Sequence, residues 1–497
     1  MAKRIMIQGT MSGAGKSLLV TALCRIFAQD GYRVAPFKSQ NMALNSFVTP
    51  DGLELGRAQA AQAEAAGLEC DVRMNPVLLK PSSDTGSQLI VNGEVRGHYA
   101  AADYFKMKRG LIPDILAAYK GLAAENDIIV IEGAGSPAEI NLRADDIVNM
   151  GLAELVNAPV LLAGDIDRGG VFAQLYGTVA LLREEERRRV KGTIINKFRG
   201  DVALLRPGLR QLEELTYIPV LGVVPWVRAD IDDEDSLAPR LEKTHSDRAL
   251  DIVVIRLPHI SNFTDFAPLD EHPDMGMRYV NRPDKLGQPD MILLPGTKNT
   301  MGDLIWLREN GLADAIIAAA GKGTPVLGVC GGYQMLGRTL SDPTGVERQG
   351  MLPGLGLLPV HTVFTGDKTR TRRSAVCEAA PFAGAALTGY EIHMGKTDTN
   401  GAAPFCRFVD GTADGAVCRS VFGTYLHGLF DSGKLVDSLA QYLAARKGIT
   451  ISNAPVETRA AYRNRQYDLL ADAVRKAMDM KRIYEIMEEY ADEDPAR

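Results

Sequence analysis

The sequence predicts two doubly wound α/β domains followed by a C-terminal helical segment, and three observations support this prediction. Its 497 residues are more than a single hydrophobic core usually serves. Short apolar runs alternate with segments long enough to form a helix, a pattern typical of domains built on a parallel sheet. One charged stretch with few apolar residues, at 229–250, interrupts this alternation and indicates a linker.

The predicted linker separates a first domain at residues 1–228 from a second domain at residues 251–436. The apolar runs of the first domain lie at 3–8, 127–132, 158–163, 191–195 and 218–224. Those of the second domain lie at 251–257, 290–294, 325–329, 355–360 and 417–425, with turn-rich sequence between about 340 and 415. Residues 437–497 are predicted to be helical, because apolar residues repeat at helical spacing between Leu469 and Met478.

Composition and charge exclude several classes of protein. The formal net charge is −6 and no long basic block is present, so we expect no nucleic acid partner and no anionic membrane surface. The six cysteines form no CxxC pair, which argues against a zinc cage or a disulfide framework and favours the reducing cytoplasm. The apolar stretch Ile5–Ile7 is too short for a signal peptide or a membrane span.

A glycine-rich loop at residues 9–17 follows the first predicted strand and opens the first predicted helix. Glycines in such a loop let backbone N–H groups turn toward a triphosphate, and the helix N-terminus favours the same anion. Lys16 would reach the outer phosphates of ATP, and the Ser17 hydroxyl would contact Mg²⁺. Five residues separate Gly9 from Gly15, so Thr10 stands where the motif has its first glycine. The residues expected to bind the nucleotide here are Thr10, Gly13, Gly15, Lys16 and Ser17.

Two charged residues at predicted strand ends complete the candidate nucleotide site. Glu132 ends the apolar run 127–132 and precedes Gly-Ala-Gly, so we expect it to be the second metal contact beside Ser17. Lys38 follows another predicted strand and would add positive charge over the phosphates. The alternatives are a solvated acid for Glu132 and a surface lysine for Lys38.

The second predicted domain contains a candidate nucleophile at Cys330. Strand, sharp glycine-flanked turn and helix follow one another around it, an arrangement that exposes the side chain at the turn. A free thiol is mostly protonated at neutral pH, so a base is needed. His427, at the end of a late apolar run, is the first candidate for that base, and His393 is its competitor. Gly296 follows the strand before the turn and would offer backbone N–H groups to an oxyanion or form a plain turn.

The first domain resembles the dethiobiotin synthetase group of ATP-dependent carboxylate-activating enzymes, through its extended loop, Lys38 and Glu132-Gly-Ala-Gly. The resemblance implies that the terminal phosphate of ATP passes to a carboxylate or carbamate, and that Asn196 contacts the base. The other metal-binding acid of that group has no clear counterpart in this sequence. Related partitioning ATPases carry a further lysine early in the loop, where this chain has Met11, which argues against a switch protein.

The second domain resembles the class I glutamine amidotransferases, which have a flavodoxin-like fold, through the order of turn glycine, Cys330 and His427. The resemblance implies that Cys330 attacks the side-chain amide of glutamine and releases ammonia. Most members carry a glutamate two residues after the histidine, where this sequence has Leu429. Its absence is typical of the branch that includes cobyric acid synthases and cobyrinic acid diamide synthases. Glu391 is a candidate for the missing partner by its proximity in sequence.

Over nearly its whole length the chain resembles the cobyric acid synthase family. The stretches that carry this resemblance are 40–45, 80–86, 164–172 and 389–393. It implies amidation of the b, d, e and g carboxylates of adenosylcobyrinic acid a,c-diamide, so a corrin polycarboxylate and glutamine would be the small-molecule partners. Lys80 and Arg168 are candidates for holding the corrin carboxylates. The alternatives are a cobyrinic acid a,c-diamide synthase, a CTP synthase, and a nonenzymatic P-loop switch with an inactive glutaminase-like module.

Overall fold

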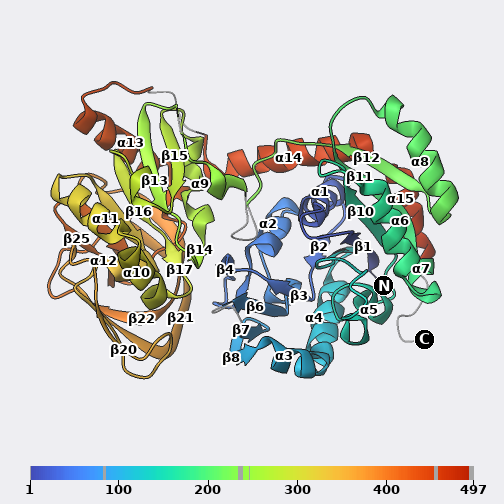
Figure 1. Ribbon diagram of the computed structural model, residues 1–497, viewed down its shortest axis with the longest axis horizontal. Helices are drawn as coiled ribbons and strands as arrows, with labels where there is room; N and C mark the ends of the chain where they lie inside the picture. Colours follow the sequence, from blue (N-terminus) through green and yellow to red (C-terminus); the bar gives the residue numbers. More distant parts are fainter. Residues whose placement is uncertain (1, 82–85, 233–238, 246, 453–456, 492–497) are drawn as a thin grey trace. The chain divides into compact units, whose positions relative to one another are not determined.

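The computed structural model describes residues 2–81, 86–232, 239–245, 247–452 and 457–491. The chain divides into two compact units (Figure 1). Unit 1 comprises residues 1–42, 54–232 and 463–497, and unit 2 comprises residues 43–53 and 233–462. The predicted linker at 229–250 lies partly outside the described residues, which leave out 233–238 and 246.

Unit 1 is built on a parallel six-stranded sheet, which confirms the predicted α/β class. Its strand order is β12-β11-β10-β1-β9-β2, and neighbouring strands are parallel throughout. Because β1 lies between β9 and β10, the carboxyl ends of these two strands flank the loop that follows β1. The strands are β1 (Lys3–Gly9), β2 (Val34–Phe37), β9 (Ile128–Glu132), β10 (Val160–Asp165), β11 (Val190–Phe198) and β12 (Val220–Pro225).

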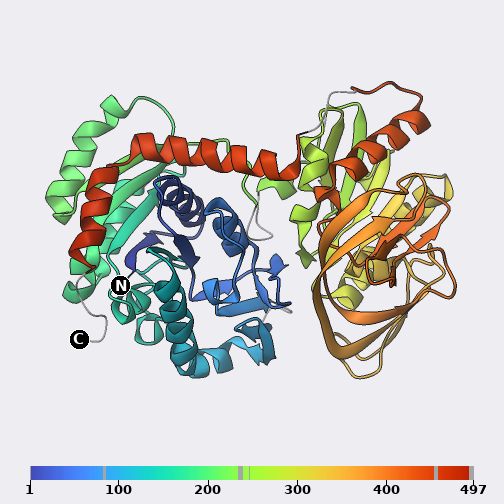
Figure 2. The same ribbon diagram turned by 180° about the vertical axis from the view of Figure 1, so that it is seen from behind.

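The helices of unit 1 include two that come from the far end of the chain. Helices α1, α14 and α15 share one hydrophobic core with this sheet, in which Phe27 packs edge-on against Tyr484. Figure 2 shows the red α14 running past α1, with α15 beside the sheet. The helices are α1 (Lys16–Gln29), α2 (Arg57–Ala65), α3 (Ala101–Met107), α4 (Ile112–Glu125), α5 (Met150–Leu155), α6 (Val171–Leu181), α7 (Glu184–Arg189), α8 (Val202–Thr216), α14 (Arg459–Ala477) and α15 (Met480–Glu489).

Unit 1 also contains a smaller mixed sheet that the apolar runs do not indicate. Its order is β3-β6-β7-β8, with β3 and β6 parallel and the other pairs antiparallel. The outer strand β8 is mostly exposed, so its sequence lacks the apolar run that marks a buried strand. The strands are β3 (Gln40–Met42), β6 (Val77–Pro81), β7 (Gly86–Val91) and β8 (Glu94–Ala100), and a short strand β5 (Glu54–Gly56) precedes α2.

Unit 2 is built on a second six-stranded sheet in the order β15-β13-β16-β18-β26-β25. All neighbouring pairs are parallel except β25 with β26. This sheet also fits the predicted α/β class, because its central strands are continuous apolar runs buried on both faces. The strands are β13 (Leu250–Ile255), β15 (Met275–Val280), β16 (Met291–Leu294), β18 (Val326–Val329), β25 (Ala416–Cys418) and β26 (Val421–Thr424).

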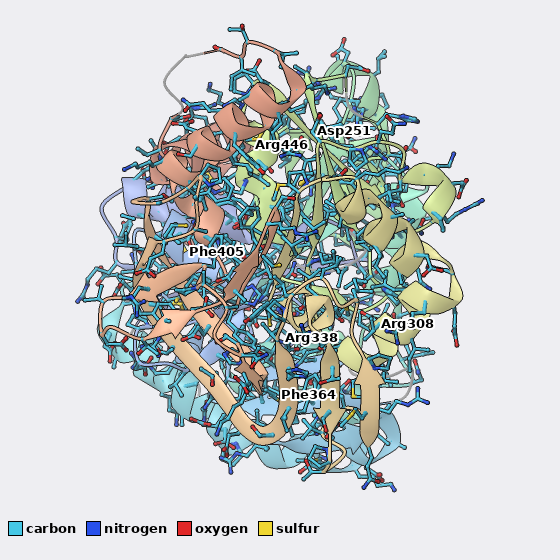
Figure 3. All side chains as sticks on the ribbon, turned by 90° about the vertical axis from the view of Figure 1, so that its left-hand side faces the viewer. Asp251, Arg308, Arg338, Phe364, Phe405 and Arg446 are labelled. Atoms are coloured by element: carbon cyan, nitrogen blue, oxygen red, sulfur yellow. The ribbon has the colours of Figure 1, made fainter. Side chains whose placement is uncertain are left out.

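The turn-rich stretch between about 340 and 415 forms a further sheet of unit 2. Its order is β20-β19-β21-β23-β24, and β22 pairs with β21 in a long antiparallel hairpin. Figure 3 labels Phe364 on β21 and Phe405, and both side chains are buried in the core of the unit. The strands are β19 (Thr339–Asp342), β20 (Gly350–Pro353), β21 (His361–Cys377), β22 (Ala386–Asp398), β23 (Cys406–Phe408) and β24 (Ala413–Asp414).

The predicted C-terminal segment at 437–497 contributes to both units, since α13 belongs to unit 2 and α15 to unit 1. The part of the chain that the structure describes has no helix with the length and apolar character of a membrane span. The remaining elements of unit 2 are β4 (Ser46–Val48), β14 (Ile260–Ser261), α9 (Ala267–Glu271), β17 (Gly296–Thr297), α10 (Thr300–Glu309), α11 (Leu312–Gly321), α12 (Gly331–Leu336) and α13 (Gly433–Lys447).

Candidate active sites

The loop between β1 and α1 has the backbone shape that phosphate binding requires. Gly13 and Gly15 adopt positive φ angles of 76° and 90°, which residues with a side chain rarely adopt. A Cβ atom on Gly15 would also lie 2.1 Å from Nδ2 of Asn196, so this position has room only for glycine. Because α1 begins directly at Lys16, its N-terminus is available to the same anion.

Two of the predicted nucleotide contacts bind backbone carbonyls at this loop. Lys16 Nζ donates to the carbonyl oxygens of Met11, at 3.1 Å, and Gly135, at 3.0 Å. Asn196 Nδ2 donates to the carbonyl oxygen of Ala14 at 2.9 Å. The structure therefore brings Asn196 to the loop itself, while its contact with the base remains a prediction.

Lys197 is a loop contact that the sequence analysis did not identify. Its Nζ donates to the carbonyl oxygen of Gly13 at 2.6 Å and to the carboxylate of Asp165 at 2.8 Å. Lys197 and Asp165 lie near the carboxyl ends of the neighbouring strands β11 and β10. This position at strand ends is the one sequence signal from which they could have been predicted. At the start of the loop, Thr10 Oγ1 donates to Gln174 Oε1 at 3.1 Å.

The predicted metal contacts and Lys38 form one buried cluster. Ser17 Oγ and Lys38 Nζ both donate to Oε1 of Glu132, at 2.8 Å and 2.9 Å. Gln62 Nε2, which the sequence analysis did not identify, donates to the other carboxylate oxygen at 2.5 Å. Glu132 is 1% exposed and Lys38 is 4% exposed. The structure therefore contradicts the two alternatives, a solvated acid at Glu132 and a surface lysine at Lys38.

The donor set of this cluster fits a hard divalent cation. Mg²⁺ usually takes one or two carboxylates together with hydroxyl, water and phosphate oxygens. The Ser17 hydroxyl and the Glu132 carboxylate supply such oxygens within hydrogen-bond distance of each other. The described residues contain no group of three or more His, Cys, Asp or Glu that could hold a metal without a ligand's oxygens.

A cavity of about 340 Å³ lies next to the candidate nucleotide site of unit 1. Its wall includes Gly135, the residue whose carbonyl accepts a hydrogen bond from Lys16. Lys108 and Arg143 add positive charge to a wall that also carries acidic side chains, and burial lowers the pKa of Lys108. The cavity therefore offers space for a small molecule beside the carbonyl that binds Lys16.

The two residues that the sequence suggested for substrate carboxylates differ in their surroundings. Lys80 is buried and forms an ion pair with Glu54 at 2.6 Å, so its charge is already offset. Arg168 is exposed in the loop between β10 and α6. Of the stretch 80–86, residues 82–85 lie outside the described residues.

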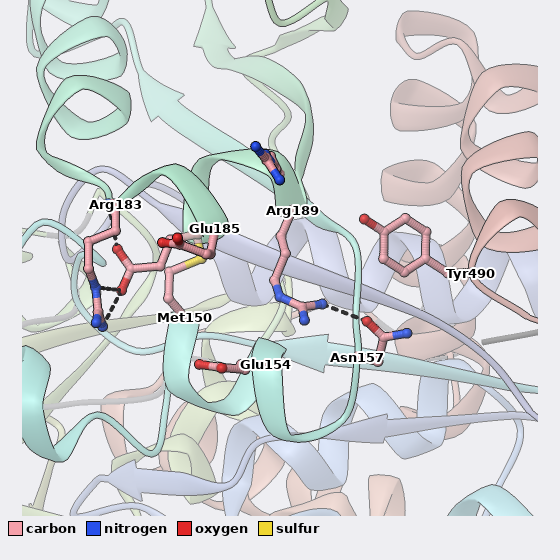
Figure 4. Close-up of a pocket in the computed structure, with 9 residues that line it drawn as sticks. Met150, Glu154, Asn157, Arg183, Glu185, Arg189 and Tyr490 are labelled. Carbon is pink, nitrogen blue, oxygen red and sulfur yellow. Dashed lines mark hydrogen bonds and ion pairs between the residues drawn. The ribbon is translucent and has the colours of Figure 1, made fainter. Parts of the chain in front are cut away.

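Figure 4 shows another cavity of unit 1, of about 370 Å³, which is lined by residues of α5, α7 and Tyr490. Its arginines already have partners within the protein. Arg189 Nη1 donates to Asn157 Oδ1 at 2.7 Å, and Arg183 pairs with Glu186 at 3.0 Å. These interactions offset the positive charge of the arginines in the cavity wall, and we assign no ligand to this cavity.

In unit 2 the chain turns sharply at Cys330 between β18 and α12. Cys330 has a φ angle of 53° and a ψ angle of −110°, a conformation that a residue with a side chain rarely adopts. A Cβ atom on Gly332 would lie 2.1 Å from the carbonyl oxygen of Leu294, so the turn needs glycine there. The thiol therefore sits on a strained strand-to-helix turn, as the motif predicts.

His427 lies beside this thiol and is held by a carboxylate that the sequence analysis did not identify. Its Nδ1 is 2.6 Å from Oδ2 of Asp265, on the short 3₁₀ helix at Phe263–Phe266. The other Asp265 oxygen accepts the backbone N–H of Gly428 at 3.2 Å. Cys330, His427 and Asp265 thus follow one another in the order that the nucleophile, base and orienting acid of a catalytic triad require.

The charge of Asp265 decides the protonation of His427. Burial disfavours the charged imidazole and by itself lowers the pKa of His427. The charge of the Asp265 carboxylate and side-chain hydrogen bonds with Asp265 and Cys330 outweigh this effect and raise the pKa to about 10. At neutral pH the ring is therefore cationic, and a cation beside a thiol favours the nucleophilic thiolate. Apart from Cys330, Nε2 of His427 has no hydrogen-bond partner among the described residues.

The structure contradicts Glu391 as the partner of His427. Glu391 accepts a hydrogen bond from Arg373 Nε at 2.8 Å and lies 3.6 Å from Nε2 of His393. His393, the competing base, stacks on the ring of Tyr425 at 3.7 Å. Residues two apart on a strand share a face, so Glu391 on β22 pairs with its own neighbour rather than with His427.

Gly296 lies where backbone donors could serve the reaction at Cys330. A Cβ atom on Gly296 would lie 3.3 Å from Cε1 of His427. A Cβ atom on Gly331 would lie 3.1 Å from the backbone nitrogen of Thr297, the residue after Gly296. The backbone at Gly296 therefore runs beside both the imidazole and the residue that follows the nucleophile, as an oxyanion site requires.

Comparison with known families identifies both halves of the chain. Residues 5–238 match the model of the CobQ/CobB/MinD/ParA nucleotide binding domain. Residues 251–435 match the model of the CobB/CobQ-like glutamine amidotransferase domain. The first match covers the phosphate loop and the Glu132 cluster, and the second covers the Cys330, His427 and Asp265 site.

Curated relatives match the chain over almost its full length. A cobyric acid synthase of Lachnoclostridium phytofermentans is 55% identical over 98% of this chain and 100% of the relative. Cobyric acid synthases of Ruminiclostridium cellulolyticum and Citrobacter koseri are 54% and 53% identical and cover 98% and 99% of each chain. Identity of this level extends across both domains, so each half of the chain has a counterpart in these relatives. The chain therefore belongs to the cobyric acid synthase family.

Proposed function

We propose that this enzyme uses ATP and glutamine to amidate the b, d, e and g carboxylates of adenosylcobyrinic acid a,c-diamide. The observation that carries the proposal is the identity of 52–55% with cobyric acid synthases over nearly the whole chain. The two candidate sites supply complementary chemistry, since a carboxylate is a poor electrophile whereas an acyl phosphate accepts ammonia readily. One unit would make the acyl phosphate and the other would supply the ammonia.

In unit 1, the loop residues Thr10, Gly13, Gly15 and Lys16 would hold the phosphates of ATP, and Asn196 would contact the base. Ser17 and Glu132 would hold Mg²⁺, which supplies charge neutralisation at the phosphates when bound. Lys38 adds a fixed positive charge to the same cluster. These side chains orient the terminal phosphate toward the acceptor carboxylate, and transfer leaves ADP and an acyl phosphate.

In unit 2, the Cys330 thiolate would attack the side-chain carbonyl carbon of glutamine, and the backbone at Gly296 would bind the developing oxyanion. His427 gives its Nε2 proton to the nitrogen as the carbon–nitrogen bond breaks, and ammonia leaves. Water activated by the neutral imidazole then hydrolyses the thioester to glutamate. Asp265 holds Nδ1 throughout and keeps the ring in the productive orientation.

Replacing Asp265 by asparagine is expected to lower glutamine-dependent amidation roughly 100-fold or more, because the ring loses its orienting charge. Amidation with added ammonium should stay within about twofold, since ammonia bypasses Cys330 and His427. Asp251→Asn is the matched control: Asp251 pairs with Arg278 at the opposite end of the parallel sheet of unit 2. Equal loss with both nitrogen sources in Asp265→Asn would contradict the assigned role.

The same variant should change how stability depends on pH. The pKa of His427 rises from 6.5 to about 10 on folding, so protonation favours the folded state. This contribution is complete below pH 6.5 and is lost as the pH rises toward 10. The difference in melting temperature between wild type and Asp265→Asn should therefore be largest below pH 6.5 and shrink toward pH 10.

Mass spectrometry of the corrin product tests the proposed substrate. Each exchange of a carboxylate for an amide lowers the mass by one fixed step, so the number of steps counts the amidated groups. We expect four steps from adenosylcobyrinic acid a,c-diamide, one for each of the b, d, e and g carboxylates. Two steps from cobyrinic acid, and none from its a,c-diamide, would instead identify the rival a,c-diamide synthase.

A further inference from the structure

Residues 43–53 belong to unit 2 although the chain on both sides of them belongs to unit 1. The segment follows β3, contains β4 and ends immediately before β5. Its backbone turns on itself through a hydrogen bond from Thr49 N to the carbonyl oxygen of Leu53 at 2.8 Å. A short segment within the nucleotide-binding part of the sequence is thus part of unit 2.

The segment at 43–53 binds the two residues that flank His427. The backbone N–H of Ser46 donates to Oδ1 of Asn262 at 3.0 Å, and the Tyr390 hydroxyl donates to the carbonyl oxygen of Ser46 at 3.1 Å. Asn262 Nδ2 lies 3.5 Å from Nδ1 of His427. The Tyr390 ring stacks on the imidazole with centroids 5.3 Å apart and planes 16° apart. The backbone N–H and carbonyl of one residue, Ser46, therefore bind both neighbours of the His427 ring.

Further contacts fix the segment against the β21–β22 hairpin. The Phe47 ring meets the Tyr390 ring edge-on at 5.0 Å, and the Arg372 guanidinium lies over the Phe47 ring, 5.3 Å from its centroid. Arg372 Nε also donates to the carbonyl oxygen of Val48 at 3.0 Å. Ser46, Tyr390 and Asn262 are each at most 5% exposed, so solvent does not compete for these hydrogen bonds.

The same segment is joined at both ends to the Glu132 cluster of unit 1. Lys38, which binds Oε1 of Glu132, lies eight residues before Ser46. Gln62, which binds Oε2, lies nine residues after Leu53 on helix α2. Ser46 is therefore connected to the partners of Glu132 by a short stretch of chain on either side.

We propose that residues 43–53 are a coupling segment that sets the position of His427 according to the state of the nucleotide site, with Asn262 and Tyr390 as positioning residues. The proposal rests on the proposed function and adds a link between its two half-reactions. A misplacement of about 1 Å at a reacting group can cost roughly 100-fold in rate, so small shifts at Ser46 are enough. Such a link restrains glutamine hydrolysis until an acceptor is present.

The test is the stimulation of glutamine hydrolysis by ATP plus the corrin acceptor. Couplings between sites are typically about 5- to 150-fold, and we expect wild type to lie in this range. Tyr390→Phe removes the hydroxyl that binds Ser46 but keeps the ring on His427, and should reduce stimulation to about twofold or less. Tyr442→Phe is the matched control, since its ring packs on Phe382 and Arg446 within the same unit.

A second variant changes the segment itself. Phe47→Ala removes the ring that packs on Tyr390 and should also lower stimulation, while leaving amidation with ammonium within about twofold. A merely structural role would lower stimulated and unstimulated hydrolysis by the same factor, and that result would overturn the proposal. Wild type without any stimulation would overturn it too. Failure of wild type to amidate the corrin even with ammonium would refute the proposed function instead.

Discussion

Replacing Cys330 by alanine is expected to abolish glutamine-dependent amidation and to leave ammonium-dependent amidation within about twofold. The variant loses the sulfur that would form the thioester, and nothing else in the site can replace it. The nucleotide site shares no described side chain with the Cys330 site, so the acyl phosphate should still form and accept ammonia. Steady-state amidation with glutamine and with ammonium as alternative nitrogen sources measures both effects.

Cys418→Ala is the matched control for this prediction. Cys418 is a partly buried thiol on the edge strand β25 of the same unit, outside the Cys330 site. Its replacement should leave both activities unchanged. A folded Cys330→Ala enzyme that also loses ammonium-dependent amidation would contradict the separation of the two half-reactions.

Replacing Lys16 by alanine is expected to remove amidation with either nitrogen source, by roughly a thousandfold or more. The lysine binds the carbonyl oxygens of Met11, in the phosphate loop, and Gly135, after β9, and would neutralise the outer phosphates during transfer. Without an acyl phosphate, ammonia has no electrophile to attack. Release of ADP and formation of corrin amide, measured together, should both fall.

The exposed Lys120 on α4 offers the comparison, because Lys120→Ala changes the charge of the same unit by the same amount. Unstimulated glutamine hydrolysis should survive Lys16→Ala, since Cys330, His427 and Asp265 are intact. Amidation that persists with ammonium in Lys16→Ala would show that the loop does not bind the reacting nucleotide.

Local signals in the sequence were enough to predict the fold class and to select three side chains that the structure brings together, Ser17, Lys38 and Glu132. Apolar runs mark buried parallel strands, and a glycine loop between strand and helix specifies its own backbone. Glu132 and Lys38 sit at or beside a strand end, Ser17 lies in the first turn of the helix after the loop, and parallel strands bring their carboxyl ends to one edge. The structure accordingly places Ser17 and Lys38 within hydrogen-bond distance of Glu132.

Contacts between distant segments could not be predicted in this way. Asp265 lies 162 residues before His427, and no periodicity or spacing relates the two. Glu391 was wrong as the partner because it pairs with His393, two residues further along β22, and with Arg373 on the neighbouring strand β21. The assignment of residues 43–53 to unit 2 and of α15 to unit 1 likewise depends on packing that only the folded chain reveals.

Glutamine with a heavy nitrogen isotope in its side-chain amide gives the most direct test of the two-site mechanism. The label is followed into the corrin by mass spectrometry, with ATP and adenosylcobyrinic acid a,c-diamide as the other substrates. The mechanism predicts that every new corrin amide carries the heavy isotope and that Cys330→Ala transfers none of it. Labelled amides in Cys330→Ala, or wild-type hydrolysis of glutamine that leaves the corrin unlabelled, would contradict it.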